Sequence, residues 1–355
     1  VKDLPTNMQL GLARLLQDLL IRTATTKERM NSTTRLWIGI HSRELQNLLT
    51  SRLCGRVIQT AKEIGLLEVN DRFSVGRFTK SYRVAGGYHG ASLEWFTFRP
   101  IGKTKATSGR FWNLDSVGLW LAEQLQRFDI ETEIDLTKPW EAITVSVIQS
   151  RNHYATRCEY GRFHSIYTAT PRNLRQRLRI RQSSEALHMV DVANNQPLIL
   201  GLEAKSKGYH CESWLELCSR GNLYEHVAKL CRCSREKAKE KFLPAVFDKA
   251  ESMQRYSVFK AMKKAFPSIV EYMIDVKRED HCQLAWDCQR RESQLFIDGV
   301  CGQLQKEGCE IPMIAIHDAA VSTQEGIENI EREIKRRYEV QGTGVTLHRY
   351  QLGKG

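Results

Sequence analysis

The chain has 355 residues, and its 53 Lys and Arg against 41 Asp and Glu give a formal net charge of +12. Hydrophobic residues make up 41% and charged residues 26%, an ordinary globular composition that excludes a largely disordered or fibrous chain. The length predicts two or three domains. No segment approaches the roughly 18 apolar residues of a membrane span. The first residues, VKDLPTNMQL, lack a secretory signal and an initiator Met, which leaves room for residues upstream.

The excess of basic residues predicts a polyanionic partner. With a pI of about 9.2, nucleic acid is the first candidate. An anionic membrane surface is the second, but the sequence has no lipid-anchor motif and no basic amphipathic helix with an aromatic face, so we expect no membrane partner. A basic enzyme that does not bind nucleic acid is the remaining alternative on charge alone.

The ten cysteines, without a secretory signal, indicate reduced thiols in a cytoplasm rather than a disulfide framework. One group lies close together in the sequence: His210, Cys211, Cys218, Cys231 and Cys233. Its spacing differs from the paired C-x2-C of a structural zinc site. We therefore expect ordinary core or surface cysteines there, with zinc as the minor alternative.

Three helices are predicted near the start of the chain. Residues 8–30 carry apolar positions at helical spacing, and residues 35–65 contain two further short helical patterns. Ser42 is the expected cap of the first of these two and Ser51 the start of the second. Gly65 is the expected C-cap that ends it.

A β-hairpin is predicted over residues 66–84, with turn chemistry at Asn70-Asp71 and a second strand that ends at Val84. Two helices followed by a hairpin resemble the winged helix-turn-helix domains of plasmid and phage replication proteins. That resemblance implies a DNA-binding domain over residues 1–88, although winged helices also serve as protein-docking modules. Its second helix would enter a major groove. Phosphates would be contacted by four basic residues: Arg72, Arg77, Lys80 and Arg83.

The next region is predicted to connect two parts of the protein. Gly86-Gly87 and the segment up to about residue 110 break the pattern and predict a linker. Two helices are expected between residues 114 and 150. We therefore expect residues 89–157 to form a helical linker.

Three segments far apart in the sequence carry the residues of interest. The first, HMVDVANNQPLILGL, runs into Asp191 and continues as a helix. The second, SREKAKEKFLPAVFDK, predicts a helix with Arg235 and Lys239 on one face, which Leu243 and Phe247 continue. The third, IPMIAIHDAAVS, predicts two strands joined by a turn, so that the carboxylate in the turn can meet a metal ion. Each pattern alone is common in proteins without such a function.

Their order resembles the polymerase core of the family A DNA polymerases, the family of bacterial DNA polymerase I. Asp191 fits motif A, the helix that begins at Arg235 fits motif B, and Ile316-His317-Asp318 fits motif C. The segments between them, including GRFHSIYTATPRNLRQRLRI, GNLYEHVAKLCRCSREKAK and CQRRESQLF, also follow the family order. The resemblance covers about residues 158–355.

The resemblance implies an α+β fold with the right-hand architecture of a polymerase. Its palm, an antiparallel sheet, would comprise about residues 158–205 and 272–355, and its helical fingers about residues 206–271. The helical linker over residues 89–157 would be a reduced, thumb-like region. Two Mg²⁺ ions, with Mn²⁺ as a substitute, would be held by Asp191, Asp318 and the backbone carbonyl of Val192.

Further roles follow from the same resemblance. Arg235 and Lys239 would hold the incoming triphosphate, and Lys239 would also protonate the leaving pyrophosphate. The nucleotide would also meet Gln196, Tyr224, Leu243 and Phe247. The primer–template would meet Arg162, Gln289 and His317.

The sequence also departs from the family pattern. Gln196 and Phe247 stand where the family has the Glu and Tyr that together exclude a ribose 2′-hydroxyl, so we expect weakened discrimination against ribonucleotides. Leu243 replaces an aromatic residue, and Pro244 and Asp248 replace glycines, which predicts a helix that begins or bends differently. Ala319 replaces an auxiliary acidic residue.

Together these patterns predict a template-directed DNA polymerase of a mobile element, plasmid or phage, acting in the bacterial cytoplasm. An exonuclease would need its own domain of about 150–200 residues with several carboxylates, whereas the residues upstream of the core read as a winged helix and a helical segment, so we expect neither proofreading nor 5′ nuclease activity. A variant is a primase-polymerase that uses single-stranded DNA, dNTPs and NTPs, with a small partner protein for priming. The alternatives are a catalytically silent DNA-binding replication initiator or regulator and, third, an RNA-templated polymerase.

Overall fold

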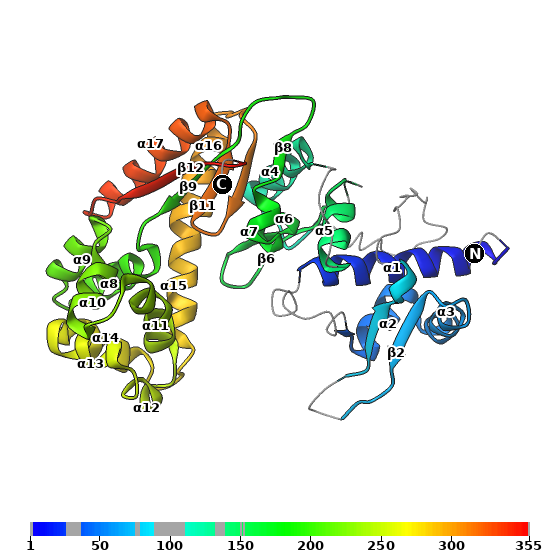
Figure 1. The fold of residues 1–355 in the computed structure, drawn as a ribbon, viewed down its shortest axis with the longest axis horizontal. Helices are drawn as coiled ribbons and strands as arrows, with labels where there is room; N and C mark the ends of the chain where they lie inside the picture. Colours follow the sequence, from blue (N-terminus) through cyan, green and yellow to red (C-terminus); the bar gives the residue numbers. More distant parts are fainter. Residues whose placement is uncertain are drawn as a thin grey trace.

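The computed structural model describes residues 3–25, 37–74, 79–88, 111–131, 139–149, 151 and 153–353. Arg77 and residues 89–110, the first part of the predicted linker, lie outside this range. Figure 1 shows an N-terminal part around α1, a small sheet near the C-terminus, and a cluster of helices on the far side of that sheet. None of the helices within the described ranges has the length and apolar character needed to cross a bilayer.

The N-terminal part combines three helices with a three-stranded antiparallel sheet. The strands lie in the order β1-β3-β2, so the last strand of the chain segment is central. Leu12, Leu15 and Leu19 of the first helix are buried at helical spacing. The elements are α1 (Thr6–Thr25), β1 (Ile38–Gly39), α2 (Ser42–Leu49), α3 (Ser51–Glu63), β2 (Leu67–Asn70) and β3 (Ser81–Val84).

The predicted helices and hairpin of this part are present, with one correction at a helix start. Ser42 is the first residue of α2 rather than its cap, because the His41 side chain accepts a hydrogen bond from the Arg43 backbone N–H. Gly65 follows α3 with φ 68°, the left-handed conformation that favours glycine after a helix.

The region between the N-terminal part and residue 158 contains short strands as well as helices. Its described elements are η2 (Gly86–Tyr88), β4 (Phe111–Trp112), α4 (Ser116–Gln124), η3 (Leu125–Arg127), β5 (Phe128–Ile130), α5 (Pro139–Gln149) and β6 (Ala155–Arg157). The expected helices are present as α4 and α5. The strands were not expected, because two or three residues are too few to show an alternating pattern.

Those strands pair across the predicted boundary near residue 158. β6 pairs with β7 (Phe163–Ser165) and β5 pairs with β8 (Leu178–Ile180), both antiparallel, while β4 lies parallel to β6. Arg157, whose side chain is only 11% exposed, bonds to Asp115 at the start of α4 and to Asp298, 2.8 Å away, on the long helix described below. Through these strand pairs and ion pairs, the region packs against the neighbouring elements.

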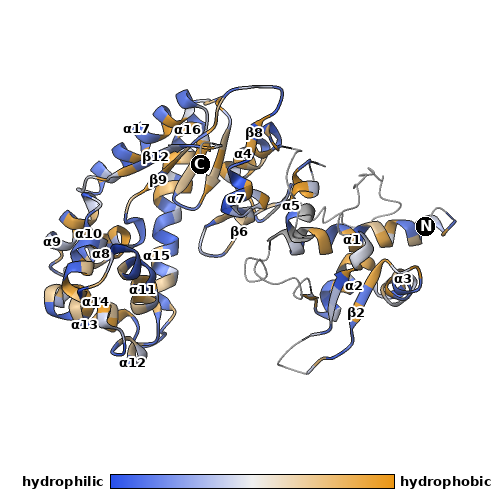
Figure 2. Cartoon of the chain, in the orientation of Figure 1, coloured by the Kyte–Doolittle hydropathy of each residue, from blue (hydrophilic) through white to orange (hydrophobic). Residues whose placement is uncertain are grey.

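A four-stranded antiparallel sheet lies near the C-terminus. Its order is β10-β11-β9-β12, formed by β9 (His188–Val192), β10 (Met313–Ile316), β11 (Ala319–Ser322) and β12 (Leu347–Gln351). All residues of β10 and β11 are buried. α17 (Gln324–Val340) packs against β9 and β11, and hydrophilic residues dominate its visible side in Figure 2. The predicted combination of helices with small antiparallel sheets is confirmed.

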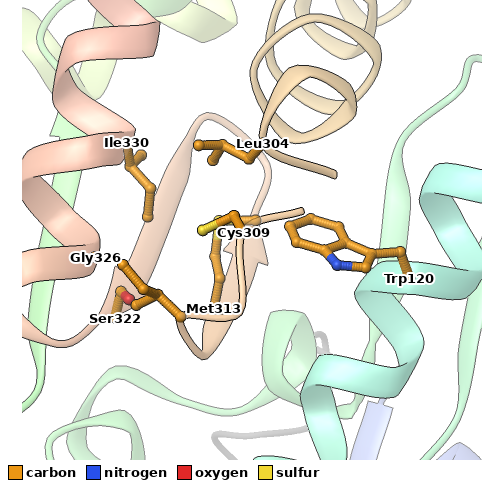
Figure 3. Close-up of a pocket in the computed structure, with 8 residues that line it drawn as sticks. Trp120, Leu304, Cys309, Met313, Ser322, Gly326 and Ile330 are labelled. Carbon is orange, nitrogen blue, oxygen red and sulfur yellow. The ribbon is translucent and has the colours of Figure 1, made fainter. Parts of the chain in front are cut away.

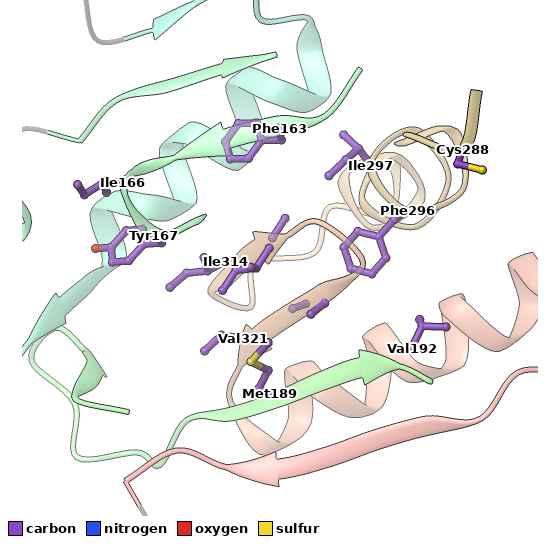
Figure 4. Close-up of a cluster of buried hydrophobic side chains, with 14 of the residues drawn as sticks. Phe163, Ile166, Tyr167, Met189, Val192, Cys288, Phe296, Ile297, Ile314 and Val321 are labelled. Carbon is purple, nitrogen blue, oxygen red and sulfur yellow. The ribbon is translucent and has the colours of Figure 1, made fainter. Parts of the chain in front are cut away.

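The hydrophobic core continues from this sheet to the neighbouring elements. Figure 4 shows Phe163, Ile166 and Tyr167, from β7 and α6 (Ile166–Ala169), on one side of the β10–β11 hairpin. Phe296 lies on the opposite side of this hairpin. Figure 3 shows a small cavity with room for about one water molecule. It is lined by residues including Trp120, Leu304 and Cys309, and it is too small for a substrate.

Helices make up most of the chain between β9 and β10. They are α8 (Asn195–Ser206), α9 (Glu212–Ser219), α10 (Leu223–Cys231), α11 (Arg235–Phe247), α12 (Ala250–Met253), α13 (Ser257–Ala265), α14 (Pro267–Val276), α15 (Gln283–Ser293), the π-helical segment η4 (Gln294–Cys301) and α16 (Gly302–Lys306). Trp214 is fully buried among them and packs on Phe242 and Phe266. α15 and its continuation run from this helical cluster to the sheet (Figure 1).

Candidate active site

Two aspartates meet at one end of the four-stranded sheet. Asp191, next to the last residue of β9, lies opposite Ala319 of the neighbouring strand β11. Asp318 directly precedes Ala319, in the two-residue turn that joins β10 to β11. The strand pairing therefore brings together two carboxylates that are far apart in the sequence.

The turn itself explains why Asp318 stands at the end of the hairpin. Ile316 pairs with Ala319, which leaves only His317 and Asp318 to reverse the chain. His317 has φ 60°, in the left-handed region, where histidine is enriched among non-glycine residues. Its ring packs edge-on against His164 of β7, with centroids 5.9 Å apart. This contact ties the turn to the neighbouring sheet.

The two carboxylates are half-buried, and the charge of Asp191 disfavours ionisation of Asp318. Burial raises the pKa of Asp318 well above its ordinary value, and the negative charges of Glu292 and Asp191 raise it further. Burial also raises the pKa of Asp191, which the charges of His348 and Lys239 lower. A cation between two such carboxylates relieves their repulsion.

The donor atoms at this end of the sheet fit a hard divalent cation. Magnesium binds through a few carboxylate oxygens together with substrate phosphates and water. Asp191 and Asp318 supply such oxygens, and the Val192 carbonyl lies next to Asp191 in the chain. The residues present therefore fit the expected metal.

Positive charges face the aspartates from α11. The helix and its expected face are as predicted, because Arg235, Lys239, Leu243 and Phe247 are all exposed or half-exposed. The opposite face, which includes Phe242, is buried. The positive charge of Lys239 lowers the pKa of Asp191, so Lys239 acts electrostatically on the end of the sheet. α11 thus presents a basic face towards the carboxylates.

Tyr224 of α10 lies between the basic face and the acidic pair. Its side chain is 6% exposed and packs edge-on against Phe242 at 5.3 Å. The Lys239 ammonium is 5.9 Å from the centre of its ring. Burial raises the pKa of Tyr224, and the charges of Asp318 and Asp191 add to that increase. Tyr224 therefore stays a neutral hydroxyl beside both sets of charges.

The structure shows the surroundings of Arg235 and Pro244 on α11. Arg235 donates a hydrogen bond from its Nε to Glu225 of α10, so an acidic residue already neutralises part of its charge. Pro244 lies inside α11, and the helix ends three residues later, where the Asp248 backbone N–H donates to the Pro244 carbonyl. The helix is complete from its Ser234 cap up to that point.

A buried carboxylate that the sequence did not single out lies next to this site. Glu292, near the end of α15, is 2% exposed. Its Oε1 accepts a hydrogen bond from Arg162 Nε at 2.8 Å, and its Oε2 accepts one from the Gln196 amide. Gln289, expected to contact the template, lies one helical turn earlier and is half-buried. The only sequence signal for Glu292 is its position one turn after Gln289.

Three further residues near the aspartates were missed. His348 of β12 lies directly opposite Asp191. Arg175 of α7 (Arg172–Arg175) lowers the pKa of Asp191 through its charge. Asn195 accepts a hydrogen bond from the Tyr338 hydroxyl, and its side chain lowers the pKa of Asp318. Nothing in the local sequence pattern marks these residues.

The basic residues of the N-terminal hairpin already have acidic neighbours. Lys80 pairs with Asp71 at 2.6 Å, and Arg83 pairs with Glu68. The Arg83 guanidinium also lies over the Trp37 ring at 4.6 Å. Arg72 is exposed, and Arg77 lies outside the described residues. Exposed ion pairs of this kind are weak and can be exchanged for phosphate contacts.

The cysteines near His210 do not form a metal site in the part of the chain that the structure describes. Cys211 and Cys218 are buried free thiols, and Cys231 and Cys233 are half-buried ones. Burial raises the pKa of Cys218 well above its usual range. Within the described ranges, three or more His, Cys, Asp or Glu side chains bring their ligand atoms together only at the consecutive residues Asp280, His281 and Cys282. Ordinary core and surface cysteines were expected, and these are found.

Comparison with known proteins gives a fold resemblance and little else. No protein-family model matches the chain, and no curated protein matches it. Among solved structures it is similar to the POL domain of Pol1 from M. smegmatis, a structure in complex with DNA primer-template and dNTP, with a TM-score of 0.42 and 12% identity. The match covers 96% of this chain and 66% of that one. At this similarity, functional inference depends on the site residues.

Proposed function

We propose that this protein is a DNA polymerase that transfers nucleotides from dNTPs to a primer 3′-hydroxyl. The observation that carries the proposal is the pairing of β9 with β11, which sets Asp191 beside the turn that contains Asp318. The positive charge of Lys239 lowers the pKa of Asp191, so Lys239 acts on the same site. Two carboxylates facing a basic helix provide separate places for metal and for triphosphate. The family order of the three motifs supports the same function.

Asp191 and Asp318, with the Val192 carbonyl, would hold two Mg²⁺ ions. When bound, these ions lower the pKa of the primer hydroxyl and neutralise charge on the leaving pyrophosphate. Asn195 supports this arrangement because its side chain lowers the pKa of Asp318 and so favours the ionised form. Ionised carboxylates are the form that binds metal.

The basic face of α11 would bind the triphosphate. Lys239 would contact its phosphates as a mobile point charge and would donate a proton to pyrophosphate as it leaves. Arg235 would exchange its bond with Glu225 for a phosphate, a substitution of one anionic acceptor by another. Tyr224, Leu243 and Phe247 would form the surface against which the base and sugar of the nucleotide pack.

The primer–template would lie beside this site, against Arg162, Gln289 and His317. We further propose that residues 1–88 are a winged helix. The element order α1-β1-α2-α3-β2-β3 and the antiparallel sheet support this assignment. α3 would enter the major groove, and Arg72, Lys80 and Arg83 would reach the phosphates.

The biological setting follows from the same proposal. We place the protein in replication of a bacterial mobile element, plasmid or phage. A priming activity that uses NTPs, with or without a small partner protein, is the variant to test alongside it. Residues 158–205 and 272–355 would be the palm and residues 206–271 the fingers.

Primer extension tests the proposal directly. Wild-type protein is incubated with a labelled primer–template, dNTPs and Mg²⁺ or Mn²⁺, and the products are compared with those of Asp191→Ala and Asp318→Ala. We expect extension by the wild type and a loss of at least about a thousandfold in both variants, as when groups that act as a unit are removed. Glu325→Ala, which removes an exposed carboxylate from the first turn of α17, serves as the matched control.

The outcomes separate this function from its alternatives. Extension that persists in both aspartate variants contradicts the proposed site. DNA binding without extension in the wild type indicates a catalytically silent initiator or regulator. Products that appear without primer when NTPs are supplied indicate the priming variant.

A further inference from the structure

A buried hydrogen-bond network connects three elements beside the aspartate pair. Glu292 at the end of α15 accepts hydrogen bonds from Arg162, in the turn between β6 and β7, and from Gln196, in the first turn of α8. Each donor uses a different oxygen of the carboxylate. The side chain of Glu292 is 3% exposed and that of Arg162 21% exposed, so water competes little for these bonds.

The network fixes the orientation of the Gln196 amide. An ionised carboxylate only accepts hydrogen bonds, so Gln196 must present its NH₂ group to Glu292. Its carbonyl oxygen is then directed away from Glu292. The usual ambiguity between the nitrogen and oxygen of an amide side chain is removed by this partner.

The network also explains why position 196 holds an amide. A glutamate at position 196 would place two carboxylates in contact in a buried site, with one arginine to share. Like charges in such a site are costly. Gln196 and Glu292 are therefore a complementary pair, in which the amide donates the hydrogen bond that the carboxylate accepts.

The position of this pair connects it to nucleotide binding. Gln196 lies five residues after Asp191, on the segment that runs from β9 into α8. The negative charge of Glu292 raises the pKa of Asp318. Glu292 supplies a hydrogen-bonding partner from the opposite element, α15.

We propose that Glu292 is a positioning residue that holds Gln196 and Arg162 rigidly beside the catalytic aspartates and thereby sets the preference for deoxyribonucleotides over ribonucleotides. This inference depends on the polymerase function proposed above. With Gln196 among the nucleotide-binding residues, a fixed side chain would limit the space beside the sugar, whereas a released one would move aside for a 2′-hydroxyl. Arg162 is held by the same carboxylate, so binding of the primer–template would depend on Glu292 as well.

A cycle of charge-exchange variants tests the inference. Single-nucleotide insertion of dNTP and rNTP is measured for wild type, Glu292→Ala, Gln196→Glu, and the double variant Gln196→Glu/Glu292→Gln. We expect the ratio of kcat/KM for dNTP to that for rNTP to fall about tenfold in each single variant, the effect of one charged hydrogen bond. In the double variant the amide at position 292 can donate to the carboxylate at position 196 and accept from Arg162, so we expect the ratio to return to within about threefold of wild type.

The matched control is Glu328→Ala. Glu328 accepts a hydrogen bond from Gln324 at 2.7 Å on the exposed side of α17, a Gln–Glu bond of the same chemistry far from Asp318 in the fold. We expect this variant to keep the wild-type ratio.

The readout distinguishes positioning from simple stabilisation. If Glu292 only stabilises the fold, both kcat/KM values fall together and their ratio does not change, which overturns the inference while leaving the polymerase function intact. Failure of the double variant to recover also overturns it. A wild-type protein that extends no primer overturns the proposed function and this inference together.

Discussion

A buried lysine provides a prediction whose size follows from the structure. Lys277, directly after α14, is 4% exposed, and its ammonium donates to the Val246 and Asp248 carbonyls and contacts the Met253 sulfur. Burial lowers its pKa from 10.5 to about 8, and the nearby negative charge of Asp248 only partly opposes this change. Lys277 therefore connects the end of α11 to α14 in a poorly solvated position.

The lowered pKa makes stability depend on pH. Between pH 8 and 10.5 the unfolded chain holds the Lys277 proton more tightly than the folded protein does, so the free energy of unfolding rises with pH in this window. Below pH 8 both states are protonated and the contribution is constant. From about pH 7.5 to about pH 9.5 the linkage relation gives an increase of about 2 kcal/mol from this group.

The assay is urea unfolding of the wild type and of Lys277→Met at about pH 7.5 and about pH 9.5. The buried thiols Cys288 and Cys301, whose pKa values are raised, act in the opposite direction above pH 9. They are common to both proteins, so the difference between the two proteins isolates Lys277. We expect the wild type to gain about 2 kcal/mol relative to Lys277→Met over this range.

Two other results would refute the reasoning. An equal response of both proteins to pH would mean that burial does not shift the pKa of Lys277. A relative loss for the wild type at the higher pH would mean that the two carbonyl acceptors favour the charged form more than burial disfavours it. In that second case Lys277 acts as a charged cap for the end of α11.

Two further predictions concern the helical cluster and its basic face. In Gly201→Ala, the new Cβ would lie 2.7 Å from both Trp214 and Leu215, so we expect a loss of about 1–3 kcal/mol in the free energy of unfolding; unchanged thermal unfolding would show that this contact can relax. In Lys239→Met, we expect KM for dNTP to rise by about ten- to a hundredfold, with Lys241→Met, on the same helix, as control. Equal effects of both lysine variants in steady-state kinetics would contradict a specific phosphate contact.

The sequence determined the local elements and the face that each presents. The 3.6-residue period in α11 places Arg235 and Lys239 on one side, because neighbours three and four apart share a helical face. Two apolar runs separated by two polar residues become the β10–β11 hairpin, because a turn of two residues suffices to reverse a strand. These outcomes depend on residues close together in the chain, which is why they can be predicted.

The tertiary structure decided which distant segments meet. Short strands such as β5 and β6 carry no readable pattern, and their partners lie beyond the expected boundary at residue 158. Glu292 looked like an ordinary helical glutamate until the fold placed it between Arg162 and Gln196. His348 gained its position only because β12 pairs with β9. Periodicity describes which way a side chain faces, whereas the partner it faces is fixed by packing across the whole chain.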